Sequence, residues 1–223
     1  MLRARVLGAL LCALLLSSAA VRADAPAGTS IPNLSQVKDQ IVEYHDSGAY
    51  DADIAHAVGE AQVWLAAHLT TPGKLAIVLD IDETSLSNWP HMRQLDFGYV
   101  PELWNNWEHE SAGWPIQPTV ALYRFAKQHN IAVFFITSRP EKEREFTVRN
   151  LESAGYRGWD GLYLRGPDSP HGPSVIPYKS GVRKMLTEKG YHILLTMGDQ
   201  MSDLDGGYAD KGFKLPNPMY FIP

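Results

Sequence analysis

The chain has 223 residues, a length that suits one folded domain with an added segment, and its formal net charge is −5. An acidic chain without a block of lysine and arginine argues against binding of nucleic-acid polymers, whose phosphates need basic partners. The single cysteine, Cys12, lies in the N-terminal apolar stretch. The rest of the chain therefore has no disulfide, thiolate metal site or cysteine nucleophile.

Residues 1–23 have the pattern of a secretory signal peptide. Arg3 and Arg5 precede the apolar run 6–16, which is too short to span a bilayer, and small residues stand before residue 24. An uncleaved membrane anchor is the alternative. Removal of this segment, which carries Arg3, Arg5 and Arg22, lowers the formal net charge from −5 to −8. We expect a periplasmic or secreted protein that does not contact the membrane after cleavage.

The rest of the chain divides into a flexible leader over 24–33 and one domain over 34–223. Apolar stripes at helical spacing and short continuous apolar runs alternate along this domain. They predict helices at 34–45, 50–68, 118–129, 140–154 and 180–189, and strands at 75–79, 131–136, 162–164 and 191–197. Continuous apolar strands separated by helices are typical of a parallel sheet covered on both faces. The predicted fold is therefore α/β, a doubly wound parallel sheet of about five strands with an N-terminal helical segment.

One segment interrupts the alternation of helices and strands. Residues 88–117 are rich in tryptophan, other aromatic residues and proline, and they are too long for a bare connection. The segment leaves directly from the end of the first strand. We therefore predict a short aromatic-rich cap insertion over the ends of the strands.

Acidic and polar residues gather where strands of this sheet are predicted to end. They are, in chain order, Asp80, Asp82, Thr137, Ser138, Lys179, Asp199 and Asp203. Lys179 is expected to open a helix, where its charge opposes the helix dipole and calls for an anionic partner. Ligands of an α/β sheet bind beyond the carboxyl ends of its strands, so we expect these residues to meet along one edge.

The residue types at this edge indicate phosphoryl chemistry. Carboxylates without histidine or cysteine partners suit a hard cation such as Mg²⁺. A lysine and a hydroxyl suit phosphoryl oxygens, and an aspartate beside the metal can attack phosphorus. Taken singly, Asp82 fits a turn cap, Asp199 and Asp203 fit turn formers around Gly206, and Lys179 fits a solvated side chain.

The ordered motifs resemble those of the haloacid dehalogenase superfamily. They are Asp80-x-Asp82-Glu83-Thr84-x-Leu86-x-Asn88, then Ile136-Thr137-Ser138-Arg139, then Lys179, then Gly198-Asp199-x-x-x-Asp203. Within that superfamily the runs at 198–204 and 213–223 are similar to the class C acid phosphatases of subfamily IIIB and their plant vegetative storage relatives. The resemblance covers residues 34–223.

This resemblance implies a role for each matching residue. Asp80 is the expected nucleophile and a metal ligand, and Asp82 is the expected general acid/base with its backbone carbonyl on Mg²⁺. Asp199 is expected on the metal directly, and Asp203 directly or through water. The phosphoryl group is expected on Thr137, Ser138 and Lys179, although the family often has glycine where this chain has Ser138.

The expected function is that of a secreted, Mg²⁺-dependent acid phosphatase that hydrolyses small phosphomonoesters through an aspartyl-phosphate. A phosphotransferase, and a catalytically idle storage or binding protein on the same scaffold, remain as alternatives. In the insertion, Trp89, Phe97, Tyr99 and Trp104 are candidates to stack on the leaving group. Stacking would favour aryl phosphates and 5′-nucleotides. The alternative is that these rings form the core of the cap or a homo-oligomer contact.

Overall fold

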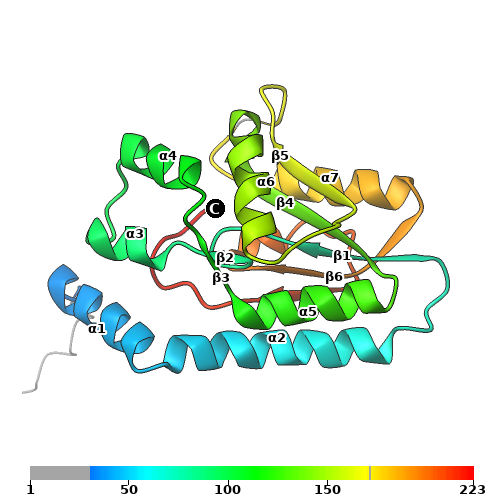
Figure 1. Cartoon of the computed structure of the whole chain (residues 1–223), viewed down its shortest axis with the longest axis horizontal. Helices are drawn as coiled ribbons and strands as arrows, with labels where there is room; N and C mark the ends of the chain where they lie inside the picture. The colour runs from blue at the N-terminus through cyan, green and yellow to red at the C-terminus, as the bar shows by residue number, and fades with distance from the viewer. Residues whose placement is uncertain (1–30, 171) are drawn as a thin grey trace, which may run out of the picture. The chain divides into compact units, whose positions relative to one another are not determined.

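The computed structural model describes residues 31–170 and 172–223, so the predicted signal peptide and most of the leader lie outside the described part. A five-stranded sheet, in the order β5-β4-β1-β6-β7, runs through its centre (Figure 1). All neighbouring strands in it are parallel. The strands are β1 (Lys74–Leu79), β4 (Ala132–Pro140), β5 (Gly161–Arg165), β6 (Tyr191–Gly198) and β7 (Lys211–Lys214).

The two faces of the sheet are covered by different helices. Ile77 and Leu79 of β1 belong to a core shared with α2 (Ala49–Ala67) and α5 (Gln117–Gln128). Their neighbours Ala76 and Val78 belong to a second core with α7 (Ile176–Glu188) on the opposite face. Strand alternation explains the division, because successive side chains point to opposite faces. The predicted doubly wound sheet is confirmed.

Short elements stand between β1 and α5, where the cap insertion was predicted. The chain leaves through β2 (Leu86–Ser87), forms α3 (Trp89–Gln94) and α4 (Pro101–His109), and returns through β3 (Trp114–Pro115). The antiparallel β2–β3 pair joins the two ends of this segment. The helices α1 (Leu34–Asp46) and α6 (Arg144–Ser153) complete the fold, with single-turn 3₁₀ helices at Glu141–Glu143 and Met201–Asp203.

The four predicted strands are confirmed, and two predicted helix starts are wrong. Pro140 is the last residue of β4, with a ψ of 150°, and a 3₁₀ turn precedes α6 at Arg144. The helix predicted from residue 180 begins at Ile176, with Pro177 in its first turn, so Lys179 lies inside that turn and does not open the helix. Strand β7 was missed because only Phe213 of its four residues is buried, which leaves no apolar run to recognise.

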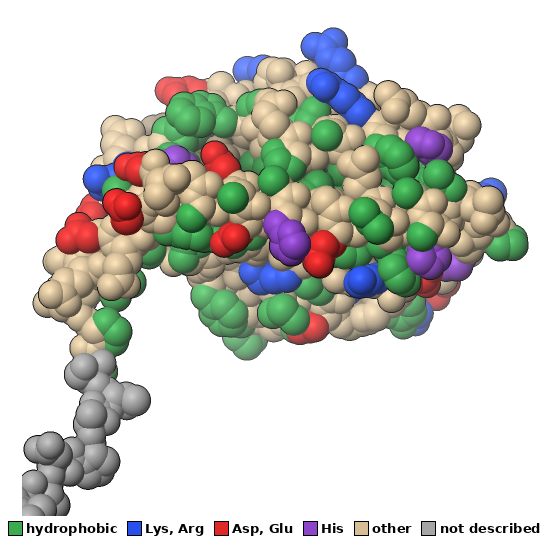
Figure 2. Space-filling view, turned by 90° about the horizontal axis from the view of Figure 1, so that it is seen from below, with side chains coloured by type: hydrophobic (Ala, Val, Ile, Leu, Met, Phe, Trp, Pro, Cys, Tyr) green, Lys and Arg blue, Asp and Glu red, His purple; other side chains and the backbone are tan. Residues whose placement is uncertain are grey.

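Figure 2 looks at the face formed by α2, and shows acidic, basic and histidine side chains scattered among apolar and neutral ones. The described part of this face carries no continuous basic stripe of the kind that binds a nucleic-acid backbone.

Arg183 is a buried structural residue that the sequence analysis did not identify. Its side chain is 1 % exposed and extends from α7 to the loop that follows the last acidic residue of the site. The guanidinium donates to the carbonyl oxygens of Asp203 at 2.7 Å and Gly207 at 2.8 Å, and also to that of Asp205. A planar guanidinium can bind several carbonyls at once, so Arg183 fixes this loop against the helix.

We predict that Arg183→Met lowers the free energy of unfolding by roughly 2–4 kcal/mol, because several loop carbonyls lose a charged donor. Chemical denaturation followed by circular dichroism measures the change. Lys184→Met, at an exposed neighbouring position of α7, serves as the matched control and should change stability by less than about 0.5 kcal/mol. Equal stability of the two variants would show that Arg183 does not stabilise the loop after Asp203.

Candidate active site

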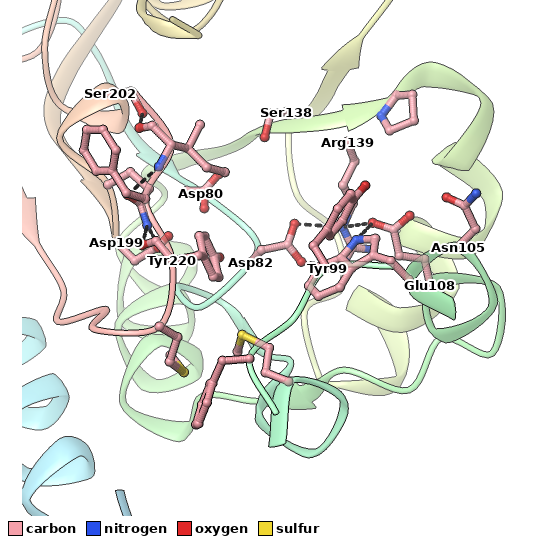
Figure 3. A pocket seen from close by; sticks show the side chains of 18 of the residues that line it. Asp80, Asp82, Tyr99, Asn105, Glu108, Ser138, Arg139, Asp199, Ser202 and Tyr220 are labelled. Carbon is pink, nitrogen blue, oxygen red and sulfur yellow. Dashed lines mark hydrogen bonds and ion pairs between the residues drawn. The ribbon is translucent and has the colours of Figure 1, made fainter. Parts of the chain in front are cut away.

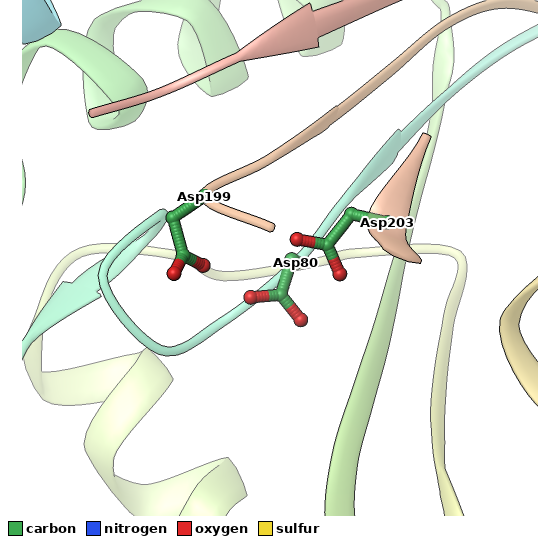
Figure 4. Close-up of side chains that lie close together, drawn as sticks. All are labelled: Asp80, Asp199 and Asp203. Atoms are coloured by element: carbon green, nitrogen blue, oxygen red, sulfur yellow. The ribbon is translucent and has the colours of Figure 1, made fainter. Parts of the chain in front are cut away.

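Three buried carboxylates meet where β1 and β6 end. Asp80 follows β1, Asp199 follows β6, and Asp203 closes the 3₁₀ turn after β6 (Figure 4). One oxygen from each lies within 4.8 Å of the others. All three donors are carboxylate oxygens, the ligand type that hard divalent cations prefer. This cluster fits a divalent metal ion.

Lys179 reaches this cluster from the first turn of α7. Its Nζ lies 2.7 Å from Asp80 Oδ1 and also donates to Asp203 Oδ1, and its side chain is 6 % exposed. Burial alone would lower the pKa of Lys179, but the two aspartates raise it. Lys179 is therefore charged, and it neutralises part of the negative charge of the cluster.

Side chains distant in sequence hold the metal-ligand candidates in place. Asp199 Oδ2 accepts hydrogen bonds from Gln200 Nε2 and Asn217 Nδ2, each at 2.7 Å. Its Oδ1 accepts from Thr84 Oγ1 at 3.2 Å. The backbone N–H of Gln200 donates to Asp203 Oδ2 at 2.8 Å. Sequence analysis did not assign Gln200 or Asn217 to the site, although both lie in the stretches that carry the family resemblance.

Asp82 follows the same strand as Asp80, but its carboxylate lies outside the three-carboxylate cluster. It turns toward Arg139, whose Nη2 and Nε donate to its two oxygens at 2.6 Å and 3.0 Å (Figure 3). Asn88 Nδ2 donates a third bond at 2.9 Å. The carboxylate of Asp82 is therefore not a member of the metal cluster, and the predicted contact through its backbone carbonyl stays a prediction.

Of the three candidate phosphate-binding residues, two line a cavity and the third, Thr137, is buried behind it. Ser138 and Lys179 line a cavity of about 510 Å³ that also contains Asp80 and Asp82. Thr137 is 1 % exposed, and its Oγ1 accepts a bond from the backbone N–H of Arg139 at 3.1 Å. That bond leaves the hydroxyl hydrogen of Thr137 available as a donor.

The wall of this cavity comes from the insertion and from the end of the chain. The insertion contributes Phe97, Tyr99, Trp104 and Glu108, among others, and the tail contributes residues 219–222. Tyr220 anchors the tail, because its hydroxyl donates to Glu83 Oε2 at 2.8 Å. The tail carries part of the family resemblance in sequence, but its residue types did not indicate that it lines the site.

One of the four aromatic stacking candidates must be withdrawn. Trp89 is 8 % exposed and stacks on His45 of α1, with ring centroids 3.7 Å apart and planes 7° apart. The ring therefore packs the cap against the N-terminal helix and does not line the cavity. Spacing alone could not separate it from Phe97, Tyr99 and Trp104, because the direction of its side chain depends on packing against α1.

The two acids of the first motif have opposite electrostatic surroundings. Burial raises the pKa of Asp80 well above its usual range, and the charge of Asp203 raises it further. Burial also acts to raise the pKa of Asp82, but the Arg139 ion pair and hydrogen bonds lower it overall. Burial, then the charge of Asp203, raises the pKa of Asp199 to about 6. The raised pKa values of Asp80 and Asp199 thus reflect burial first and the neighbouring carboxylates second, and a bound cation would lower both values.

Burial raises the pKa of two further carboxyl groups around the site. The pKa of Glu83 is about 8, with the Asp82 charge raising it and hydrogen bonds from Asn88 opposing the increase. The pKa of Glu108 is about 7, although the charge of Arg139 opposes the increase. Glu108 lines the cavity, whereas Glu83 lies behind its wall, bound to Asn88 and Tyr220. A displaced pKa in a cavity is a common property of functional sites.

The chain matches a family model described as HAD superfamily, subfamily IIIB (acid phosphatase), over residues 9–223. It is 34 % identical over 189 residues to acid phosphatase 1 of Solanum lycopersicum, which covers 82 % of this chain and 74 % of that protein. It is 31 % identical over 185 residues to a stem 28 kDa glycoprotein of Glycine max, covering 81 % and 72 %. Vegetative storage protein 1 of Arabidopsis thaliana is 34 % identical over 152 residues, covering 66 % and 55 %.

Among solved structures, the class C acid phosphatase of Bacillus anthracis superposes with a TM-score of 0.71. The match covers 84 % of this chain and 86 % of that one at 24 % identity, which supports the fold. Within residues 31–170 and 172–223, no helix combines the length and apolar character needed to cross a bilayer. The family match and the sequence relatives together show that this chain belongs to the acid phosphatases of HAD subfamily IIIB, whose substrates are phosphomonoesters.

Proposed function

We propose that this acid phosphatase requires Mg²⁺ and hydrolyses small phosphomonoesters through an aspartyl-phosphate on Asp80. The position of Asp80 carries the proposal. It lies at the end of β1, 2.7 Å from Lys179, within the three-carboxylate cluster and on the cavity wall. A buried nucleophile beside a fixed cation is suited to attack on an anionic substrate.

In this mechanism an oxygen of Asp80 attacks phosphorus, and the bond from phosphorus to the ester oxygen breaks. Asp82 gives its proton to the leaving oxygen, and Lys179 holds the phosphoryl oxygens, with Ser138 and Thr137. Water then attacks the phosphorus of the aspartyl-phosphate, and Asp82 accepts a proton from this water. Inorganic phosphate leaves, and both aspartates return to their starting states.

Asp80, Asp199 and Asp203 would hold the Mg²⁺, together with the backbone carbonyl of Asp82. When bound, the metal neutralises charge on the phosphoryl group. Gln200 and Asn217 support this assignment, since they orient Asp199 with two hydrogen bonds of 2.7 Å. Supporting residues of this kind are typical of metal sites in enzymes.

We also propose secretion, by way of the predicted signal peptide at residues 1–23. Its sequence pattern and the plant glycoproteins among the relatives support this proposal. Cell fractionation would distinguish a periplasmic from an extracellular destination. Retention of the intact N-terminus in the cytosolic fraction would contradict both.

Asp80→Asn should lower kcat for p-nitrophenyl phosphate by a factor on the order of 10⁴ or more, because the amide lacks the nucleophilic charge. EDTA should stop the wild-type enzyme, and added Mg²⁺ should restore it. A steady-state assay with and without EDTA measures both effects. Activity of Asp80→Asn within tenfold of wild type would exclude the proposed nucleophile. An inactive wild-type protein with Mg²⁺ would favour the storage alternative.

Mg²⁺ should raise the Tm of the protein more at pH 7 than at pH 5. The metal-free pKa of Asp199 is about 6, so a proton competes with the cation at the lower pH. The apparent affinity should fall about tenfold between pH 7 and pH 5 for this one group. Scanning calorimetry with and without Mg²⁺ measures the increase in Tm. Asp199→Asn should abolish the increase, and an equal increase at both pH values would contradict the assigned ligand.

We propose that Phe97, Tyr99 and Trp104 give a preference for aryl phosphates and 5′-nucleotides over glycerol phosphate. The Tyr99 ring is 70 % exposed and lies 6.1 Å from the Trp104 ring, centroid to centroid, at the cavity. A stacked base is worth about 1–3 kcal/mol, so the preference in kcat/KM should be roughly 5- to 150-fold.

Tyr99→Ala should reduce this preference and leave glycerol phosphate hydrolysis unchanged. Trp114→Ala is the matched control, because this exposed ring belongs to the same insertion but does not line the cavity. The measurement is kcat/KM across the substrate panel. Equal wild-type kcat/KM values for all substrates would mean that Phe97, Tyr99 and Trp104 only pack the cap.

A further inference from the structure

We propose that Glu108 is a positioning residue for Asp82, because it shares the guanidinium of Arg139 with Asp82 and limits how firmly Asp82 is held. This inference rests on the proposed function, in which Asp82 gives its proton to the leaving oxygen. Glu108 does not touch the reacting atoms in this account. It acts through Arg139, from the cap insertion.

The hydrogen bonds of Asp82 show why its position needs control. Arg139 donates to both of its oxygens, at 2.6 Å and 3.0 Å, and Asn88 donates to Oδ1 at 2.9 Å. These bonds hold both carboxyl oxygens of Asp82 in place, although its side chain lines the cavity. Asp82 must loosen its contact with Arg139 before it can give its proton to the ester oxygen as the phosphorus–oxygen bond breaks.

Glu108 lies beside the same guanidinium. Its Oε1 is 3.4 Å from Arg139 Nε, the atom that also donates to Asp82 Oδ2. The side chains of Arg139 and Glu108 are each 3 % exposed, so water screens this charge pair only weakly. Arg139 Nε–H donates its hydrogen bond to Asp82, and an ionised Glu108 attracts the same nitrogen, so the charge of Glu108 weakens the hold of Arg139 on Asp82.

The insertion supplies the side chain that fixes Glu108. Trp104 Nε1 donates to Glu108 Oε1 at 3.1 Å, one helical turn away on α4. Trp104 also lines the cavity beside Tyr99. A continuous series of contacts thus runs from the cavity wall through Glu108 and Arg139 to Asp82 (Figure 3).

A weaker contact between Asp82 and Arg139 affects the rate only when the leaving group needs a proton. A p-nitrophenolate leaves readily without one, whereas the oxygen of phenol or p-methoxyphenol is more basic and depends on Asp82. These substrates share a ring of similar size, so stacking on the cap contributes about equally to each. Loss of the Glu108 charge should therefore slow the substituted phenyl phosphates in the order of the basicity of their leaving groups.

The test is kcat/KM for Glu108→Gln on p-nitrophenyl, phenyl and p-methoxyphenyl phosphate with Mg²⁺ at pH 8, where the side chain of Glu108, whose pKa is about 7, is mostly ionised. The isosteric amide removes the charge and retains the size of the side chain. We expect at least a fivefold loss on phenyl and p-methoxyphenyl phosphate and less than a twofold change on p-nitrophenyl phosphate. Glu102→Gln, an exposed position on the same helix, is the matched control and should leave all three values unchanged.

An equal loss on all three substrates, or no loss on any, would overturn the role of Glu108. Circular dichroism reports whether Glu108→Gln is folded. If it is not, Glu108→Asp takes its place, since it keeps the charge but withdraws it from Arg139, and the same selective loss is expected. Failure of the proposed function would give a different result. The wild-type enzyme would then hydrolyse p-nitrophenyl phosphate without Mg²⁺, and Asp80→Asn would retain this activity.

Discussion

The ion pairs that Lys179 forms with Asp80 and Asp203 are the interactions on which the site depends. Three buried carboxylates within 4.8 Å repel one another, and burial of their charges is costly without positive partners. One lysine offsets only part of this charge, and burial, followed by the charge of Asp203, keeps the pKa values of Asp80 and Asp199 raised. The remaining negative charge suits the cluster to a divalent cation, and Asp80, Asp199 and Lys179 line the cavity.

Much of the fold serves to hold these groups still. Arg183 fixes the loop after Asp203 through three backbone carbonyls. The C-terminal tail is tied back to the strand ends, where Asn217 contacts Asp199 and Tyr220 contacts Glu83. Residues far apart in the chain thus stabilise the same cavity. Such rigid support limits the reorganisation that the site needs during the reaction.

The two acids of the first motif differ in environment more than in position. Asp80 faces other carboxylates and Lys179, whereas Asp82 faces Arg139 and Asn88. In the metal-free site burial raises the pKa of Asp80, and the Arg139 ion pair lowers that of Asp82. The proposed roles of nucleophile and proton carrier therefore require a cation beside Asp80 and a looser contact between Asp82 and Arg139. The cap contributes to the surroundings of Asp82, because Glu108 of α4 lies 3.4 Å from Arg139 Nε and accepts a hydrogen bond from Trp104.

The sequence by itself determined the α/β class and the strands β1, β4, β5 and β6, because apolar runs are a local property of the chain. Its motif order also predicted that Asp80, Lys179, Asp199 and Asp203 would lie together, as they do in the structure. Tertiary structure decided the rest. Strand β7 has one buried residue and exists through its pairing with β6. Arg183 and Gln200 are ordinary polar residues in sequence, and Trp89 resembles the other rings of the insertion. Their roles depend on which distant groups they meet, and side-chain direction is fixed only by packing.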